Sequence, residues 1–213
     1  MTTGTSEADA DAQRQAVREL ALRADSCRAQ GRYDESEALF RRALDLAEHI
    51  FSDDDRGLMP LLNNFAVLYK YSGRFDEAEM MYRRALRIAE NTPGECHAAV
   101  ATLYHNLGGL EHARGRYAEG EPLARRSVEL RRASLGDEHI DVAADMAALA
   151  GILDGLGRYD ESEPIYHRVL EIFEREAGPE NYEIAVNLNN LAAIYATKGK
   201  PEAAERMYCR ALA

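Results

Sequence analysis

The chain has 213 residues, 46% of them hydrophobic, and a formal net charge of -11 at pH 7. This charge argues against a general surface for nucleic acids or anionic membranes, and no apolar run is long enough to cross a membrane. The polar, acidic start is unlike a signal peptide, so we expect a cytoplasmic protein. Three cysteines that lie far apart argue against a disulfide framework.

The N-terminal region is the least regular part of the sequence. Residues 1–10 are small, polar and acidic, and we expect them to form a disordered tail. The first helix should then run from about Asp11 to Gln30. It has polar residues where later copies are mostly apolar, as expected of a capping helix that faces water. From residue 11 to residue 213 we expect a single repeat array.

One short segment recurs along the chain, and its copies define the repeat. They begin at a glycine and lie 42 residues apart each time, at Gly31, Gly73, Gly115, Gly157 and Gly199. A fixed period of this size is typical of stacked repeats. Each glycine should take the left-handed conformation that ends one helix. Acidic residues follow, and we expect three of them to cap the next helix: Asp34, Asp76 and Asp160.

Each glycine separates two segments with helical periodicity. After Gly73, apolar residues recur three and four apart and form one buried face, while Glu79 and Arg83 form an exposed ion pair on the other. Before the glycine, a large apolar residue stands directly ahead of a small one, as in Phe65-Ala66. Small residues at this place indicate that two helices approach closely.

This arrangement resembles the tetratricopeptide repeat, a pair of antiparallel helices. The 42-residue period, the Leu-Asn-Asn-Phe-Ala-Val-Leu-Tyr segment at 62–69 and the Gly-Asp-Glu-His link at 136–139 are similar to the kinesin-light-chain-like subclass. The resemblance covers about residues 13–213. It implies an all-α fold, a right-handed superhelical solenoid of five antiparallel helix pairs, but it implies no single activity.

The resemblance also implies where a ligand binds, because the first helix of each pair lines a concave groove in this family. Nine residues before the turn glycine, the family often carries an asparagine whose amide bonds to the backbone of an extended peptide. Asn64, Asn106 and Asn190 match this position, whereas Leu22 and Ala148 do not. The candidate peptide-binding residues are Asn63, Asn64, Val67, Lys70, Tyr71, His105, Asn106, His112, Ala148, Asn189 and Asn190. The alternative is that the three asparagines only brace adjacent helices.

Two features of the groove bear on its ligand. Lys70 is the one fixed positive charge among the groove positions, so the groove does not resemble the paired-lysine carboxylate clamp of chaperone-binding relatives. In the fourth repeat, Ala148 and Gly151 stand where other copies mostly have larger residues. We expect a hollow there that accepts bulky ligand side chains.

The sequence contains no nucleophile motif, phosphate-binding loop or paired-carboxylate constellation, and we expect neither an enzyme nor a cofactor. His105 and His112 share one helix face but stand about 10.5 Å apart along its axis, too far to share a metal ion. Two functions remain. One is a scaffold that binds a peptide or protein segment in the groove. The other is self-association through the repeat ends or the convex face, with a homodimer through the apolar face of the last helix at Tyr208 and Leu212.

Overall fold

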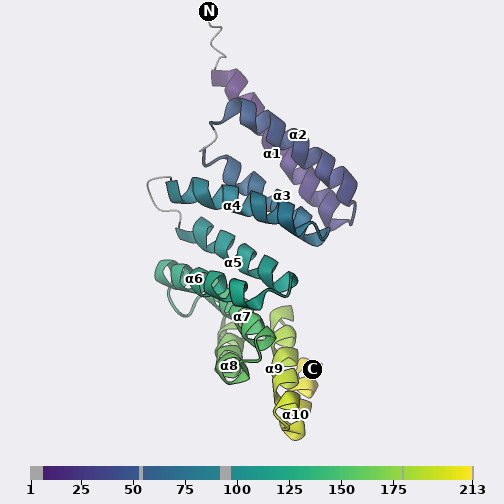
Figure 1. Cartoon of the computed structure of the whole chain (residues 1–213), viewed down its shortest axis with the longest axis vertical. Helices are drawn as coiled ribbons and strands as arrows, with labels where there is room; N and C mark the ends of the chain where they lie inside the picture. The colour runs from purple at the N-terminus through teal and green to yellow at the C-terminus, as the bar shows by residue number, and fades with distance from the viewer. Residues whose placement is uncertain (1–6, 53–54, 92–96, 179, 213) are drawn as a thin grey trace, which may run out of the picture. The chain divides into compact units, whose positions relative to one another are not determined.

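The structure, a computed structural model, describes residues 7–52, 55–91, 97–178 and 180–212. Within these ranges it contains ten α-helices and no strand (Figure 1). They are α1 Glu7–Ala29, α2 Tyr33–Ile50, α3 Leu58–Tyr71, α4 Phe75–Asn91, α5 His97–Ala113, α6 Tyr117–Leu135, α7 Ile140–Gly155, α8 Tyr159–Glu176, α9 Tyr182–Thr197 and α10 Pro201–Ala211. The predicted all-α fold of five antiparallel helix pairs is confirmed.

The helices form two compact units, residues 1–96 with α1–α4 and residues 97–213 with α5–α10. Within each unit, consecutive helices pack on one another, and α5 also contacts α7, as α7 contacts α9. The continuity of one array across both units remains a prediction.

The turn within each helix pair is built on a left-handed glycine. Gly31, Gly73, Gly115, Gly157 and Gly199 all have a φ angle between 68° and 75°. At the second turn, the Gly73 amide donates to the Lys70 carbonyl at 3.1 Å and the Arg74 amide donates to the Tyr69 carbonyl at 2.8 Å. These bonds satisfy carbonyls that the end of the helix would otherwise leave unpaired. The five predicted turns are therefore correct.

The predicted N-caps are wrong at all three aspartates. The N-cap residues of α2 and α8 are Arg32 and Arg158, which make no side-chain cap bond. Asp34 and Asp160 lie inside the first turn, where a carboxylate can interact with the helix dipole without capping it. Asp76 likewise lies within the first turn of α4. Capping side chains occur instead in the links between pairs, where His139 caps α7 and Asn181 caps α9.

The first helix is longer than predicted. It begins at Glu7, so residues 7–10 belong to α1 rather than to a tail. Alanine alternates with acidic residues in this segment, and both suit the first turn of a helix. The predicted disorder of residues 1–6 lies outside the described residues.

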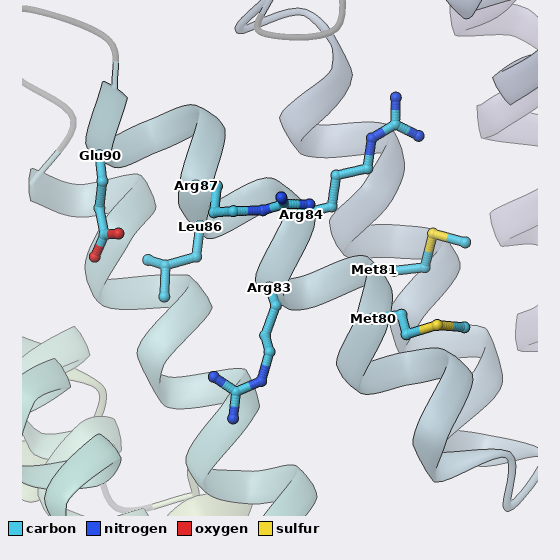
Figure 2. Close-up of a pocket in the computed structure, with 7 residues that line it drawn as sticks. All are labelled: Met80, Met81, Arg83, Arg84, Leu86, Arg87 and Glu90. Carbon is cyan, nitrogen blue, oxygen red and sulfur yellow. The ribbon is translucent and has the colours of Figure 1, made fainter.

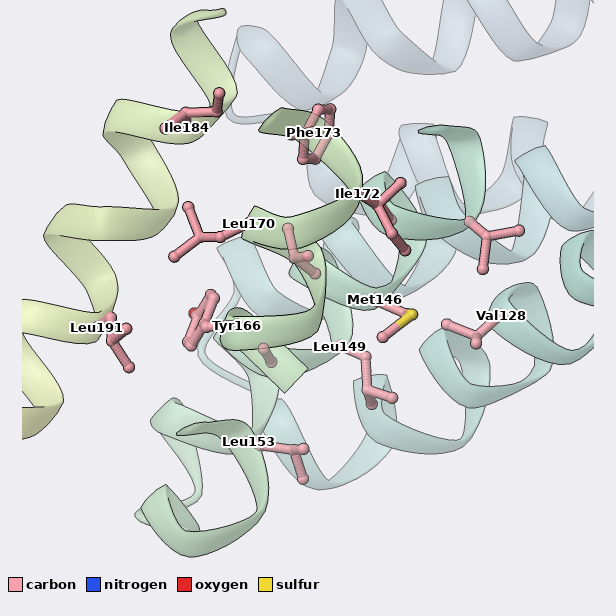
Figure 3. Packing of buried hydrophobic residues seen from close by; sticks show 14 of the residues in the cluster. Val128, Met146, Leu149, Leu153, Tyr166, Leu170, Ile172, Phe173, Ile184 and Leu191 are labelled. Atoms are coloured by element: carbon pink, nitrogen blue, oxygen red, sulfur yellow. The ribbon is translucent and has the colours of Figure 1, made fainter. Parts of the chain in front are cut away.

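The cores consist of the apolar faces that the periodicity predicted. In the first unit, the Phe65 ring stacks on Phe40 and on Tyr69, with ring centroids 5.2 and 4.5 Å apart. Figure 3 shows the core of the second unit, where buried residues of α6–α9 interdigitate: Val128, Met146, Leu149, Leu153, Tyr166, Leu170, Ile172, Phe173, Ile184 and Leu191. At Gly108 an added methyl group would lie 3.3 Å from the Ala124 backbone nitrogen, which confirms the predicted close approach of two helices.

Candidate functional site

The predicted groove residues all lie on the first helices of the pairs, and each of them is half-buried or exposed. Asn63, Asn64, Val67, Lys70 and Tyr71 lie on α3, and we call them the α3 groove face. The second unit presents a separate set, the α5–α9 groove face: His105, Asn106 and His112 on α5, Ala148 on α7, and Asn189 and Asn190 on α9. The intervening positions of these helices are mostly buried, so the groove faces are the accessible stripes of otherwise packed helices.

On the α3 groove face, Asn64 already has partners within the protein. Its amide nitrogen donates to Asp25 Oδ2 on α1 at 2.8 Å, and its Oδ1 accepts a hydrogen bond from Asn63 at 3.1 Å. Asp25 also pairs with Arg28 at 3.3 Å. The side chain of Asn64 thus connects α1 with α3, as the bracing interpretation expects. An amide offers two N–H donors, so one of them is not used in this contact.

The same region holds basic and aromatic side chains. The Arg28 guanidinium lies 5.7 Å from the centre of the Tyr71 ring, which is 65% exposed. Lys70 is half-buried, and this burial lowers the pKa of its ammonium group. Among the described residues, its side chain makes no hydrogen bond or ion pair. Lys70 is therefore a partly desolvated positive charge on the α3 groove face.

In the second unit, a buried carboxylate connects three helices. Asp145 on α7 is 2% exposed and accepts a hydrogen bond from Arg131 Nε on α6 at 2.8 Å. His105 Nδ1 on α5 lies 2.8 Å from the other carboxylate oxygen, although its N–H is not well directed at that atom. Burial alone raises the pKa of Asp145, but the interactions with His105, Arg131 and Ser127 outweigh burial and lower it.

Sequence analysis missed Asp145, although the repeat alignment contains a signal for it. The same repeat position holds Leu61 and Leu103 in the second and third repeats. The first and fifth repeats have Glu19 and Asn187 there, so the signal is an acidic residue at a position that is apolar in only two of the copies. A charge that is buried at such a position needs partners. The structure provides them in Arg131 and His105, and it thereby places a candidate groove residue, His105, in an ion-pair cluster.

A second polar cluster lies next to the predicted hollow of the fourth repeat. Tyr166 on α8 donates to Asp154 Oδ2 at 2.8 Å, and Ser162 donates to the other oxygen of the same carboxylate. Asn190 interacts with the Tyr166 hydroxyl as well. Burial and the Asp154 charge raise the pKa of Tyr166. A methyl group added at Gly151 would lie 3.8 Å from the Tyr166 hydroxyl and from His112 Nε2, so there is space for a small group.

Two surface pockets lie on second helices rather than on the groove faces. Figure 2 shows the pocket on α4, with a volume of 610 Å³, which is lined by Met80, Met81, Arg83, Arg84, Leu86, Arg87 and Glu90. A pocket of 500 Å³ on α10 involves the equivalent positions Met207 and Arg210, three repeat periods later. Both are faces of a second helix and do not coincide with the predicted ligand residues.

Within the described ranges, histidine, cysteine, aspartate and glutamate side chains form no group of three or more that could hold a metal ion. A search of the same residues finds no helix with the length and apolar character needed to span a membrane.

Helix pairs with a left-handed glycine in each internal turn define an all-α repeat protein. Residues 17–91, 99–160 and 146–213 match the tetratricopeptide repeat, and the chain belongs to this family. None of the curated proteins matches the chain.

Several solved structures are similar to the chain. BtubC (BKLC) from P. vanneervenii has a TM-score of 0.78 and 23% identity, over 96% of this chain and 87% of that one. A putative kinesin light chain of Podosopora anserina with nearly identical TPR-like repeats has a TM-score of 0.77 and 18% identity, over 92% of each chain. YrrB, described as a TPR protein with an unusual peptide-binding site, has a TM-score of 0.58 and 18% identity, over 95% of this chain and 92% of its own. These likenesses bear out the kinesin-light-chain-like resemblance at the level of the fold.

Proposed function

We propose that this protein is a non-enzymatic scaffold that binds a peptide or protein segment along the groove faces. One observation carries the proposal: every predicted groove position is half-buried or exposed, on helices whose intervening residues are mostly buried. Polar side chains at such places offer donors and acceptors to the backbone of an extended segment. YrrB, which has the same fold, is described as having a peptide-binding site. We propose further that the protein acts in the cytoplasm and engages neither nucleic acid nor membranes.

The test is a selection of short random peptides displayed on phage against the wild-type protein. The affinity of the best selected peptide is then measured for wild type and for Asn106→Ala. The proposal expects a several-fold loss of affinity with a melting temperature close to that of wild type, because a groove amide contributes to the bound peptide rather than to the core. Glu129→Ala, an exposed change on α6, is the matched control and should leave both values unchanged. A lower melting temperature with unchanged affinity would support bracing instead.

The hollow in the fourth repeat can be tested with the same peptide. Ala148 is half-buried on α7, and its replacement by phenylalanine should fill the space beside Gly151. The proposal expects loss of peptide binding while the helical circular dichroism signal is retained. Unchanged affinity in Ala148→Phe would contradict a ligand side chain in this hollow.

The second candidate function is self-association through α10. Tyr208 and Leu212 are 43% and 89% exposed, so two large apolar side chains of the last repeat are accessible to a second copy. Under this proposal, the molecular mass in analytical ultracentrifugation increases with protein concentration, and Tyr208→Asp or Leu212→Asp restores a monomer. A strictly monomeric wild-type protein at high concentration would exclude it.

A further inference from the structure

The starting observation is the Asp154 carboxylate in the last turn of α7. It is half-buried, and it accepts hydrogen bonds from two neutral hydroxyl groups, that of Tyr166 at 2.8 Å and that of Ser162. Within the described part of the chain it forms no ion pair. A partly buried carboxylate is more stable beside a cation than beside neutral donors alone. Asp154 is therefore a fixed negative charge without a counter-ion.

The arginine closest to it along the chain is already paired. Arg158 follows Asp154 by four residues, and it donates to Glu121 and to Glu161, each at 2.6 Å. The chain as a whole has a net charge of -11, which favours the approach of basic partners. A counter-ion for Asp154 therefore has to come from a ligand.

The packing of Tyr166 does not require this carboxylate. Two repeat periods earlier, the equivalent Tyr82 is fully buried, and its hydroxyl has no hydrogen-bond partner in the described part of the chain. One period before that, the equivalent residue is Phe40, which is also fully buried and has no hydroxyl. The position of Asp154 itself holds a different residue in each repeat: Arg28, Lys70, His112, Asp154 and Ala196. An acidic side chain at this position is thus a property of the fourth repeat and not of the fold.

Two glycines and an aromatic ring adjoin the carboxylate on the same face of α7. Gly151 and Gly155 are four residues apart, so they lie one above the other on the helix. A methyl group added at Gly151 would lie 3.8 Å from His112 Nε2 and from the Tyr166 hydroxyl, which leaves room for a ligand group. A methyl group added at Gly155 would overlap the half-buried Tyr117 ring, so this ring lies directly against the helix backbone. The rings of His112 and Tyr117 meet edge to face, with their centroids 5.3 Å apart.

A carboxylate beside an aromatic ring suits one kind of cation best. A guanidinium group is planar, pairs with carboxylate oxygens through directed N–H donors, and stacks on aromatic faces. Each carboxylate oxygen has about two acceptor sites, so the bonds from Tyr166 and Ser162 leave others for a ligand. A lysine ammonium can meet the charge but gains less from the ring.

We propose that this place is an arginine subsite, in which Asp154 pairs with the guanidinium of an arginine in the ligand segment and Tyr117 packs against it. Gly151 and Gly155 provide the room between them. Tyr166 and Ser162 act as positioning residues, because their hydroxyls fix the carboxylate. The inference rests on the proposed function, and it specifies one ligand side chain for the fourth repeat.

The first test uses the displayed random peptides. Selection on the wild-type protein should enrich arginine at one fixed peptide position, and selection on Asp154→Asn should not. In the best selected peptide, this arginine is then replaced by citrulline, which has nearly the same shape but no charge. The replacement should weaken binding to wild type about tenfold, the loss of roughly one hydrogen bond between charged groups, and should change binding to Asp154→Asn much less.

Asp141→Asn is the matched control, because it makes the same change in charge at an exposed carboxylate of the same helix. It should keep both the arginine enrichment and the effect of citrulline. An equal effect of citrulline on wild type and Asp154→Asn would overturn the inference. Peptides that bind wild type without any arginine preference would also overturn it, while the proposed function would stand.

A second measurement needs no selected peptide. Acetyl-arginine-methylamide is titrated into labelled protein while the backbone amide resonances of Gly151 and Gly155 are followed by NMR. The inference expects a saturable change that is several-fold weaker with the citrulline analogue and in Asp154→Asn. A linear response, or an equal response to both compounds, would overturn it. If no displayed peptide binds the wild-type protein while the arginine compound still binds at Asp154, the proposed function fails and the subsite remains.

Discussion

Removal of the Asp145 carboxylate is the sharpest test of how the second unit is held together. Asp145 is 2% exposed and faces two basic side chains, Arg131 and His105, of which Arg131 is 12% exposed and His105 is 35% exposed. In Asp145→Ala, Arg131 loses its ion-pair partner while it remains largely covered. Among the residues that the structure describes, the remaining partner of Arg131 is Thr102 Oγ1, in a weaker contact at 3.3 Å.

The magnitude follows from the burial of these groups. Breaking a buried pair by removing one partner costs about 3–5 kcal/mol, and we take about 3 kcal/mol because His105 can turn toward solvent. For a chain of this size, 1 kcal/mol shifts the melting temperature by about 2–4 °C, so we expect a decrease of roughly 6–12 °C. Asp145→Asn keeps an acceptor for Arg131 and should cost less. Differential scanning calorimetry measures both variants.

The control is Asp141→Asn on the same helix, where the carboxylate is 55% exposed. This change should alter stability by no more than about 0.5 kcal/mol. If Asp145→Ala melts at the same temperature as Asp141→Asn, the interactions of Asp145 with Arg131 and His105 contribute no net stability. Water then solvates the two basic side chains as well as Asp145 does.

The pH dependence of stability gives an independent check. The pKa of Asp145 is lowered in the folded protein, so its stabilising contribution is complete above the unfolded pKa of about 3.9. The contribution is lost as the pH falls through the folded value, because the unfolded state then binds more protons. The difference in stability between wild type and Asp145→Asn should therefore shrink below about pH 4. If the stability difference between wild type and Asp145→Asn stays constant down to the pH of acid unfolding, Asp145 is not the ionised carboxylate that we assign.

Two further comparisons each use a matched position as the control, a second glycine of the same helix in one case and the equivalent tyrosine of another repeat in the other. Gly155→Ala should destabilise the protein, because its new methyl group would overlap the Tyr117 ring, whereas Gly151→Ala meets only ordinary contacts and should be neutral or stabilising by up to about 1 kcal/mol in thermal unfolding. Tyr82→Phe should leave the melting temperature unchanged or raise it, since it removes a hydroxyl without a partner, whereas Tyr166→Phe should lower stability by about 1 kcal/mol. Equal effects in the two tyrosine variants would mean that Tyr82 has a partner in solution.

The sequence was sufficient to predict the helix pairs because the determinant is local. A left-handed φ angle is open to glycine at little steric cost, and glycine recurs at one fixed interval, so Gly73 and its equivalents could be assigned without tertiary information. The caps were not predictable in the same way. Aspartate is a favoured N-cap residue, but α2 already begins at Tyr33, directly after the turn, so Asp34 lies inside the helix.

The candidate site was predictable only in its placement. The repeat register places the residues on helix faces that are half-buried or exposed, and their role toward a ligand stays a prediction. The partners of their side chains depend on contacts between distant positions. Asn64 contacts Asp25, which lies in the atypical first helix and has no acidic equivalent at the same repeat position in the other copies. No local pattern reveals such a pair.

The asparagines nine residues before the turn glycines have different partners in different repeats. Asn64 donates to Asp25 on a first helix, whereas Asn190 interacts with Tyr166 on a second helix. Leu22 and Ala148 occupy the equivalent position without any amide, and their helices still pack. If helix packing required an asparagine at this position, its amide would have the same partner in each repeat. The helices that carry Leu22 and Ala148 would then pack less stably. The feature common to Asn64, Asn106 and Asn190 is their place on the groove faces, which favours a role toward a ligand and makes Asn106→Ala the decisive substitution.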